Sequence, residues 1–570
     1  MNIGDGGFKT VQSSPLLLDA MTTTTNLTAI TLESYQNRKE TCRRFLEQVQ
    51  GLENTKMTED DYINLLLMKK EVETYLDGFE FKGYYTPVVR NEDIKTYFEK
   101  VVSGMNFRNE EDYEKLFLRF QKFPQQIESF ITLMMRHGLQ EGRVSHIMVM
   151  RKSLDTLAQF IQLSAEATQF YKPFLKLKDL QTISAERKRS IEQRGLQLIK
   201  NEILGSFETL VNFLRDEYML HVRPHLAFSS LPNGEAFYQG ALKFHLAYDL
   251  TAKEVHDIGL QEVKRIRNDI KKVMERVGYE GSIAEFFEYT RISKQSHFNS
   301  QEEIMDEFRN NVERICRELP KYFKTIPDAE LRIEEIASSS RSTAYARYDG
   351  ASLDGKRPGT VFLNCHDPES RSNFQLMALA LHEAMPGHHL QFSYSSMMEH
   401  WPGFRRCKDE RQNCTVPSNF PKHTAYIEGW GMYCEFLGEE MGMYDDPYSL
   451  FGRYCMELER ACRAVVDTGL HAFQWSKEQV IDYFQRNTPT SRDLIELQVD
   501  RFVAFPAQAC TYTIGLLKFK ELRRKAERQL GEKFDVRDFH EAVLSCGMVP
   551  LTVMELLVDK YIERTLKNDN

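Results

Sequence analysis

Several features that would assign this sequence to a special class of protein are absent from it. No stretch of the 570 residues approaches the roughly 20 consecutive apolar residues that a membrane-spanning helix needs. No basic segment precedes a hydrophobic one near the N-terminus, so the sequence predicts no secretory signal and indicates a cytoplasmic protein. A phosphate-binding P-loop and the glycine fingerprint of dinucleotide-binding folds are also missing.

Positive charge and patterned cysteines are scarce as well. The formal net charge is -9, which argues against a general nucleic-acid-binding protein. The ten cysteines form no C-x-x-C pair, so we expect free thiols. No long linker divides the chain, and we expect a disordered leader at 1–30 and one helical domain at 31–570, with an N-terminal part (31–225) and a catalytic part (226–570).

Helical periodicity dominates what is present. Apolar residues recur at three- and four-residue spacing over residues 59–77, with Thr58 as a candidate N-cap. Capping boxes that begin at Thr251 and Ser476 predict two further helix starts. The same periodicity predicts helices at 110–136, 141–172, 186–219 and 301–318, and from residue 372 almost to the C-terminus.

Only two segments favour strands, residues 329–337 and 358–364, and a turn-rich stretch separates them. The sequence therefore predicts a mainly α fold, a large multi-helix body with a small β element just before the helix near residue 372. A short strand in that position is one that an extended substrate peptide can pair with through its main chain.

The sequence H-E-A-M-P-G-H-H, which begins at residue 382, has the composition of a metal site. In the zinc motif H-E-x-x-H, two histidines bind the metal and the glutamate activates a water. His382 and Glu383 provide the first half of this motif. The second half is interrupted, because the next histidines are His388 and His389.

Helix geometry leaves two interpretations of the second ligand. His389 returns to the same face of an ideal helix as His382, but about 10 Å further along the axis. A bulge at Pro386 and Gly387 would instead bring His388 to the place of the usual second histidine, since proline lacks an N–H and glycine permits a turn. We favour His388 and keep His389 as the alternative.

A catalytic zinc needs a third protein ligand and an open position for water. Glu428, on a second predicted helix, is the candidate. Glu435 follows seven residues later on the same helix face and is suited to orient a ligand imidazole. Two imidazoles and a carboxylate suit one Zn²⁺ ion, with Glu383 as the general base.

These residues resemble, in chain order, the motifs of the family called domain of unknown function 885. Its signature H-E-x-x-P-G-H-x-L-Q resembles residues 382–391, its glutamate motif resembles 426–430, and its R-x-V-x-D-T-G-x-H helix resembles 463–471. Further blocks that resemble the family lie at 357–364, 506–515 and 539–551. The resemblance extends from about residue 30 to about residue 565, and it implies a zincin-like helical fold with metallopeptidase or related hydrolase activity.

Two positions depart from the family pattern. Ala507 stands where the C-terminal block has glycine, and the stretch from Gln498 to Phe502 lacks the acidic residue and the tyrosine of the family. A carboxylate and a phenol near the site are therefore lost, which affects expected substrate contacts more than the metal ligands.

A third group of candidates lies on one helix stripe, where Arg463, Asp467 and His471 follow at four-residue spacing. On an exposed face they would form an ion-pair ladder, but the surrounding residues are apolar and indicate a buried, functional face. Arg463 is then a candidate clamp for a substrate carboxylate, and Asp467 a support for the ligands. His471 is a candidate to donate to the oxyanion or brace Glu428, and Tyr512 is the second oxyanion candidate.

The leading hypothesis is a zinc metallopeptidase that cleaves peptide bonds with a water activated by Glu383. One alternative is a zinc hydrolase of small amides or esters. Another is a non-catalytic binding protein that retains the fold, although a scaffold has no need of Glu383. The expected partner is a peptide or small amide or ester substrate, with neither nucleic acid nor a membrane.

Overall fold

The structure is a computed structural model that describes residues 30–53, 55–86, 94–293, 297–336, 345–352, 357–406 and 416–567. All but the last residue of the predicted leader, 1–30, lies outside the described residues. The eight cysteines within the described ranges are free thiols, as the sequence predicts.

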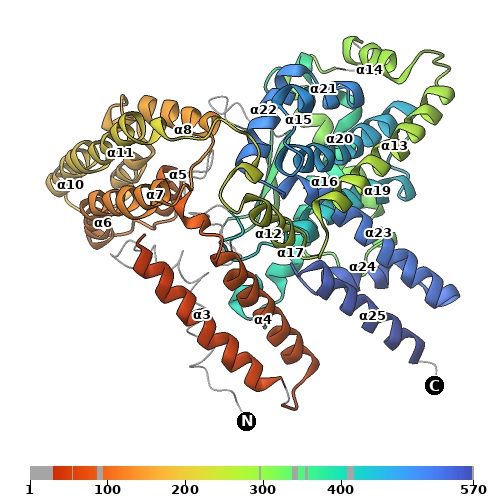
Figure 1. Cartoon of the computed structure of the whole chain (residues 1–570), viewed down its shortest axis with the longest axis horizontal. Helices are drawn as coiled ribbons and strands as arrows, with labels where there is room; N and C mark the ends of the chain where they lie inside the picture. The colour runs from red at the N-terminus through yellow and green to blue at the C-terminus, as the bar shows by residue number, and fades with distance from the viewer. Residues whose placement is uncertain are drawn as a thin grey trace.

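Most of the helices form two groups, and the first two helices of the described chain form a separate pair (Figure 1). The group that we call the lobe contains α5 to α11, and the larger group that we call the body contains α12 to α25 and the sheet. The predicted boundary at residue 225 lies in the segment that leads from α11 to α12.

A separate pair, α3 (Leu32–Leu52) and α4 (Glu59–Phe79), packs side by side. The lobe consists of α5 (Ile94–Ser103), α6 (Glu110–Ser129), α7 (His137–Gln140), α8 (Ile147–Phe160), α9 (Lys172–Leu175), α10 (Ala185–Leu198) and α11 (Gly205–Asp216).

The body carries the long helices that surround the candidate site. Its first four helices are α12 (Gly234–Leu246), α13 (Ala252–Arg276), α14 (Ile283–Ile292) and α15 (Gln301–Glu318). After the sheet come α16 (Leu376–Glu383), α17 (His388–Met397), α18 (Gly403–Arg406), α19 (Thr424–Glu440), α20 (Pro447–His471), α21 (Lys477–Asn487), α22 (Arg492–Ala504), α23 (Thr511–Leu530), α24 (Val536–Leu544) and α25 (Leu551–Lys567).

Most predicted helix starts are confirmed by their caps. The side chain of Thr58 accepts a hydrogen bond from the N–H of Asp61, and complete capping boxes begin at Thr251 and Ser476. The predicted helix at 141–172 is wrong in length, because α8 covers only Ile147–Phe160. Gly142, at a φ of 67°, and the cap at His146 delay its start, and short 3₁₀ turns follow its end.

The predicted β element is confirmed as a small sheet with one strand more than expected. In the described residues, β1 (Leu331–Glu335) pairs in parallel with the central β3 (Gly359–Leu363), and β2 (Ala346–Asp349) pairs antiparallel with β3 on its other side. The sequence did not indicate β2, which is only four residues long. Both outer strands therefore present a main-chain edge away from β3.

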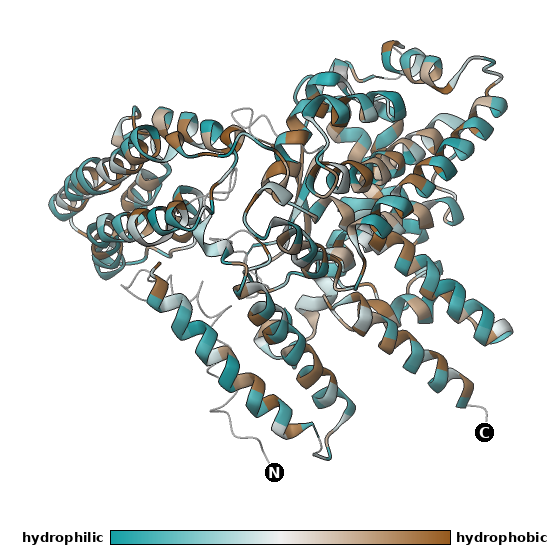
Figure 2. Ribbon diagram, in the orientation of Figure 1, coloured by the Kyte–Doolittle hydropathy of each residue, from teal (hydrophilic) through white to brown (hydrophobic). Residues whose placement is uncertain are grey.

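Burial of one face organises the helices of both groups. Figure 2 shows polar and apolar residues mixed along nearly every helix, as amphipathic helices require. In α16 of the body, by contrast, every residue is buried, and most residues of α20 are buried as well. Among the described helices, none combines the length and apolar character that crossing a bilayer requires.

Candidate metal centre

The helical run of the metal motif is broken into two helices rather than bulged within one. α16 ends at Glu383 and α17 begins at His388. Gly387 adopts ψ of -131°, and a Cβ at this position would lie 1.8 Å from the carbonyl oxygen of His382. Only glycine fits such a close approach, which explains why the chain can turn between the two histidines.

The break brings together the three residues that the sequence singled out as ligands. One donor atom each of His382, His388 and Glu428 lies within 4.8 Å of the other two. Oε2 of Glu428 is 3.4 Å from Nε2 of His382 and 3.6 Å from Nε2 of His388. The two imidazole rings are nearly perpendicular, with centroids 4.8 Å apart.

The helix α19 is fitted closely to the first histidine. A Cβ at Gly431 would lie 2.6 Å from Cε1 of His382, so the imidazole rests directly on the backbone of α19. From the residue directly before this glycine, Nε1 of Trp430 donates to the carbonyl oxygen of Pro386 at 2.9 Å and holds the break against α19. The spacing of these residues along α19 therefore places Glu428 opposite the two histidines.

Glu435 fixes the orientation of the first histidine, as predicted for a residue behind the ligands. Its Oε1 lies 2.7 Å from Nδ1 of His382, which turns Nε2 of the ring toward Glu428. Burial lowers the pKa of His382, but the nearby carboxylates of Glu428 and Glu435 outweigh burial and raise that pKa to about 9. The nearby imidazoles of both histidines hold the pKa of Glu428 well below its usual range despite its burial.

His389 contacts the sheet and not the histidine cluster. Its Nδ1 lies 3.1 Å from the hydroxyl of Tyr348 on β2, and its Nε2 lies 3.1 Å from the carbonyl oxygen of Ala329 just before β1. Both ring nitrogens are therefore used to attach α17 to the sheet. Of the two neighbouring histidines, the structure brings only His388 to the cluster with Glu428.

The predicted base, Glu383, is the last residue of α16 and directly follows His382 in the chain. It is 8% exposed, and its carboxylate makes no hydrogen bond or ion pair with any residue that the structure describes. A buried carboxylate without a partner beside the histidine cluster can accept a proton without breaking an internal contact.

Two of the three residues predicted on α20 are occupied elsewhere. Both ring nitrogens of His471 bond to backbone: Nδ1 accepts from the N–H of Phe228 at 3.4 Å, and Nε2 lies 2.9 Å from the carbonyl oxygen of Phe502. The prediction that His471 donates to an oxyanion or braces Glu428 is therefore wrong. Burial lowers the pKa of His471 to about 3, so this crosslink is neutral.

Asp467 also acts at a distance from the ligands. Its Oδ1 accepts from the hydroxyl of Tyr238 at 2.6 Å and from the N–H of Ala507 at 2.9 Å, whereas its buried Oδ2 has no partner among the described residues. Burial raises the pKa of Asp467 to about 7, although these hydrogen bonds oppose the shift. The prediction that Asp467 supports the metal ligands is replaced by a link between α20, α12 and the turn at Ala507.

Arg463 is partly engaged inside the protein. Its Nη2 donates to Glu459 at 2.6 Å and its Nε to Gln498 at 3.3 Å, whereas its Nη1 has no partner among the described residues. Its role as a clamp for a substrate carboxylate therefore stays a prediction. The guanidinium group also lies over the ring of Tyr512, 5.4 Å from the centroid. Gln498, which replaces an acidic residue of the family pattern, thus takes part in positioning Arg463.

Sequence reasoning missed Arg460, the charged residue of α20 that approaches the cluster. Its Nη2 lies 3.8 Å from Oε1 of Glu435, and its guanidinium group lies 6.0 Å from the centroid of Tyr512. The negative charges of Glu435 and Glu428 help to raise the pKa of Arg460 against its burial. The sequence alone does not distinguish Arg460 from the other charged residues of α20, which include Arg453, Glu457, Glu459 and Arg463.

Comparison with known proteins supports the motif resemblance. A family profile described as "Bacterial protein of unknown function (DUF885)" matches residues 18–558. A protein of Colwellia psychrerythraea, provisionally described as a lipoprotein, has a crystal structure 22% identical in sequence, with a TM-score of 0.88 and 98% of each chain covered. A protein of Shewanella oneidensis, provisionally described as a lipoprotein of unknown function, is 16% identical, with a TM-score of 0.71, 96% of this chain and 98% of that chain. No curated protein matches the chain.

Proposed function

The chain belongs to the family of bacterial proteins of unknown function DUF885, and from that premise we propose that it is a zinc-dependent hydrolase that cleaves peptide bonds. One observation carries the proposal: donor atoms of His382, His388 and Glu428, from three separate helices, converge within 4.8 Å. Two imidazoles and a carboxylate are the donor set of many catalytic zinc sites.

The distances between the donors fit a metal ion better than they fit direct hydrogen bonds. Ligands at about 2.0–2.2 Å from a tetrahedral zinc ion are separated from one another by about 3.3–3.6 Å. The two nitrogen-to-oxygen distances in the cluster, 3.4 and 3.6 Å, match this separation. Glu435 on Nδ1 of His382 completes the arrangement, because ligand histidines commonly donate their other N–H to a carboxylate.

A zinc ion held by these three residues would supply Lewis acidity and lower the pKa of a water molecule. The chain provides the remaining parts of a hydrolytic site. In this proposal the free carboxylate of Glu383, which directly follows His382 in the chain, takes a proton from that water and returns it to the leaving nitrogen. Tyr512, held beneath Arg460 and Arg463, offers a hydroxyl that can donate to the oxygen where negative charge develops.

The position of the sheet favours a peptide over a small amide or ester as substrate. Among the described strands β2 is an edge strand, and Tyr348 on β2 bonds to His389, which directly follows His388. An extended peptide that adds to such an edge would be held by main-chain hydrogen bonds beside the cluster. We therefore place the scissile bond of an extended chain at the cluster.

The test is metal analysis combined with a digest of peptides of graded length, with small amides and esters alongside. We expect about one zinc ion per chain, and peptide cleavage that chelation abolishes and added zinc restores. Cleavage of only the small amides or esters would favour the alternative hydrolase. A protein that binds no metal, or that cleaves peptides equally well after chelation, would contradict the proposal.

The cellular compartment of the protein is also part of the proposal. The sequence predicts a cytoplasmic protein, whereas both solved structures are of proteins provisionally described as lipoproteins. Fractionation of the native host decides between the two, with recovery in the membrane pellet contradicting the cytoplasmic assignment.

A further inference from the structure

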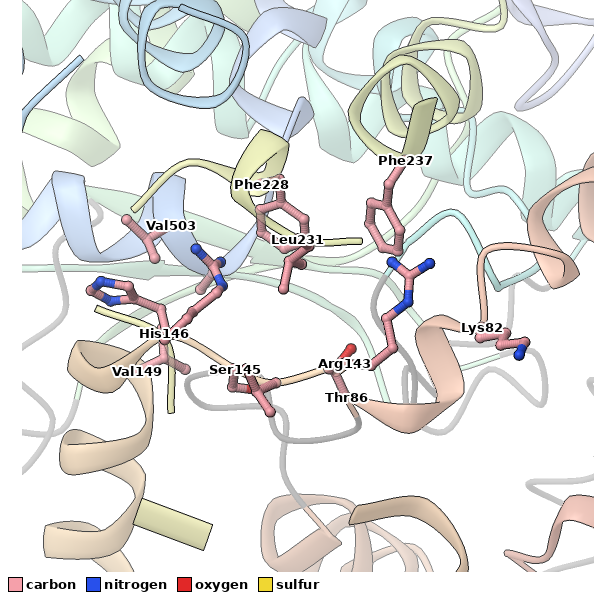
Figure 3. Close-up of a pocket in the computed structure, with 13 residues that line it drawn as sticks. Lys82, Thr86, Arg143, Ser145, His146, Val149, Phe228, Leu231, Phe237 and Val503 are labelled. Carbon is pink, nitrogen blue, oxygen red and sulfur yellow. The ribbon is translucent and has the colours of Figure 1, made fainter. Parts of the chain in front are cut away.

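A second feature with the character of a binding site lies away from the histidine cluster, where α8 of the lobe meets the body (Figure 3). It is a cavity with room of about 30 Å³ for the centres of water-sized groups. Its lining contains four basic residues and, among the described residues, no acidic one. The basic residues are Lys82, Arg143, His146 and Arg223, and the apolar walls include Phe228, Leu231 and Phe237.

Arg143 is the most unusual residue of this lining. Its side chain rises into the cavity beside Phe237 (Figure 3), with the guanidinium carbon 5.6 Å from the centroid of that ring. Arg143 is buried, with only 9% of its surface exposed. Its guanidinium group nevertheless makes no hydrogen bond or ion pair with any described residue, and its buried Nη1 has no partner. Burial lowers the pKa of Arg143, and the negative charge of Glu141, which is paired with Lys82, opposes this shift without reversing it. A buried charge without a partner is costly, which indicates that a partner from outside the chain is needed.

Arg223 brings a second buried cation to the same cavity. Its Nη1 donates to the carbonyl oxygens of His225, Leu226 and Ala227, which anchors the side chain without neutralising its charge. The buried Nε has no partner, and no carboxylate of the described residues pairs with Arg223. Burial lowers its pKa to about 10, so Arg223 remains protonated at neutral pH.

The other two basic residues contribute little charge. Lys82 is paired with Glu141, with Nζ 2.7 Å from Oε2. Burial lowers the pKa of His146 to about 4, and its Nδ1 accepts from the N–H of Met148. The positive potential of the cavity therefore comes from the two buried arginines.

We propose that this cavity is a binding site for a small monovalent anion, either a halide or a single carboxylate group. The volume of the cavity suits a group of this size, and guanidinium groups pair strongly with such anions. The apolar walls disfavour a strongly hydrated multivalent anion, which would lose more hydration energy on entry.

The bound anion would link the lobe to the body. The segment that contains Arg143 and His146 belongs to the lobe, and an isolated parallel bridge joins His146 to Arg223 in the connection that leads to the body. Val503 and Ala504, at the end of α22, close the cavity on the body side. An anion bound to Arg143 would offset part of the positive charge at this junction and stabilise the relative placement of the two groups. This role is independent of the proposed hydrolase activity.

The experiment measures thermal unfolding of the full chain in potassium bromide, potassium acetate and the potassium salt of the bulky sulfonate MOPS, all at one ionic strength. Arg143→Met is the informative variant, because Arg143 has no internal bond to lose. Arg151→Met, at an exposed position on α8 shortly after Arg143, is the matched control. We expect bromide or acetate, but not MOPS, to raise the midpoint of thermal unfolding of the wild-type protein and of the control. Arg143→Met should weaken anion binding by about tenfold or more and abolish this rise.

Crystals of the wild-type protein soaked in bromide provide a second readout that does not depend on a variant. We expect an anomalous peak within hydrogen-bond distance of the Arg143 guanidinium group when the halide is the ligand. If acetate but not bromide stabilises the protein, the carboxylate source is identified instead. Equal midpoints in all three salts, or an unchanged anion response in Arg143→Met, would overturn the proposal.

Discussion

Nδ1 of His382 lies 2.7 Å from Oε1 of Glu435, while Nε2 of the same ring lies 3.4 Å from Oε2 of Glu428. Two carboxylates of one helix thus face the two nitrogens of a single imidazole. This relationship assigns them different tasks, since the closer carboxylate orients the ring and the more distant one is left to share a cation with it.

Replacing Glu435 tests the orienting task. We expect Glu435→Gln to weaken zinc binding by about 10- to 100-fold, because a neutral amide holds the Nδ1–H less strongly. The measurement is a competition titration with a fluorescent chelator. Glu439→Gln, on the same helix but paired with Arg453 at 2.8 Å, should leave zinc affinity unchanged. Equal affinities for the two variants would refute an orienting role.

The neighbouring histidines should behave differently when each is replaced by alanine. His388→Ala removes a donor of the cluster and should abolish stoichiometric metal. His389→Ala should retain the metal but lower the free energy of unfolding by about 1–3 kcal/mol, since it leaves Tyr348 and the Ala329 carbonyl without their partner. Metal content and urea denaturation check the pair, and the reverse pattern would move the ligand by one position.

Glu383 is expected to act in turnover but not in metal binding. Glu383→Gln keeps the size of the side chain and removes its ability to take a proton, so kcat should fall by about 10²- to 10⁴-fold while the zinc content stays at the wild-type value. Turnover is measured on the best peptide from the graded panel. A variant with undiminished kcat would show that another group is the base.

Ala507 occupies a backbone conformation that suits glycine. Its φ is 68°, in the left-handed region, where an L side chain costs about 1 kcal/mol or more. We expect Ala507→Gly to raise the free energy of unfolding by about 0.5–1 kcal/mol after the entropy cost of glycine is included. The matched change Ala509→Gly, in the 3₁₀ turn that follows, should destabilise the protein. Urea denaturation of both variants decides, and destabilisation by Ala507→Gly would contradict the argument.

Asp467 should make stability depend on pH. Burial raises its pKa from 3.8 to about 7, so the folded protein keeps a proton that the unfolded chain releases between these values. The contribution of Asp467 is therefore fully present below pH 3.8 and is lost, by about 1.4 kcal/mol per pH unit, as the pH rises toward 7.

The measurement for Asp467 compares wild type with Asp467→Asn by urea denaturation from pH 4.5 to 7.5. The amide cannot ionise, so the stability of the variant relative to wild type should increase across this range. A constant difference would show that Asp467 titrates normally.

The outcome of the sequence predictions follows from the range of the interactions involved. Helix caps such as those at Thr251 and Ser476 depend on residues three apart and were predicted correctly. The cluster could be predicted because few residue types bind a metal ion. The structure brings His382, His388 and Glu428 together as the motif suggested.

Long-range packing explains what the sequence did not reveal. His471 looked available for catalysis, but its partners, the backbone of Phe228 and of Phe502, lie 243 and 31 residues away in the chain. Arg460 was overlooked because its approach to Glu435 depends on how α20 crosses α19. The cavity at Arg143 likewise arises from segments that are distant in sequence.

The imidazole of His382 rests on Gly431, between two glutamates that are three and four residues away along α19. The spacing E-x-x-G-x-x-x-E in the sequence of α19 thus indicates the position of the imidazole ring. In a relative that keeps the histidines but has a larger residue in place of this glycine, the imidazole ring would have to move. The glycine therefore distinguishes relatives that can hold the ring in this position from relatives that share only the histidines of the motif.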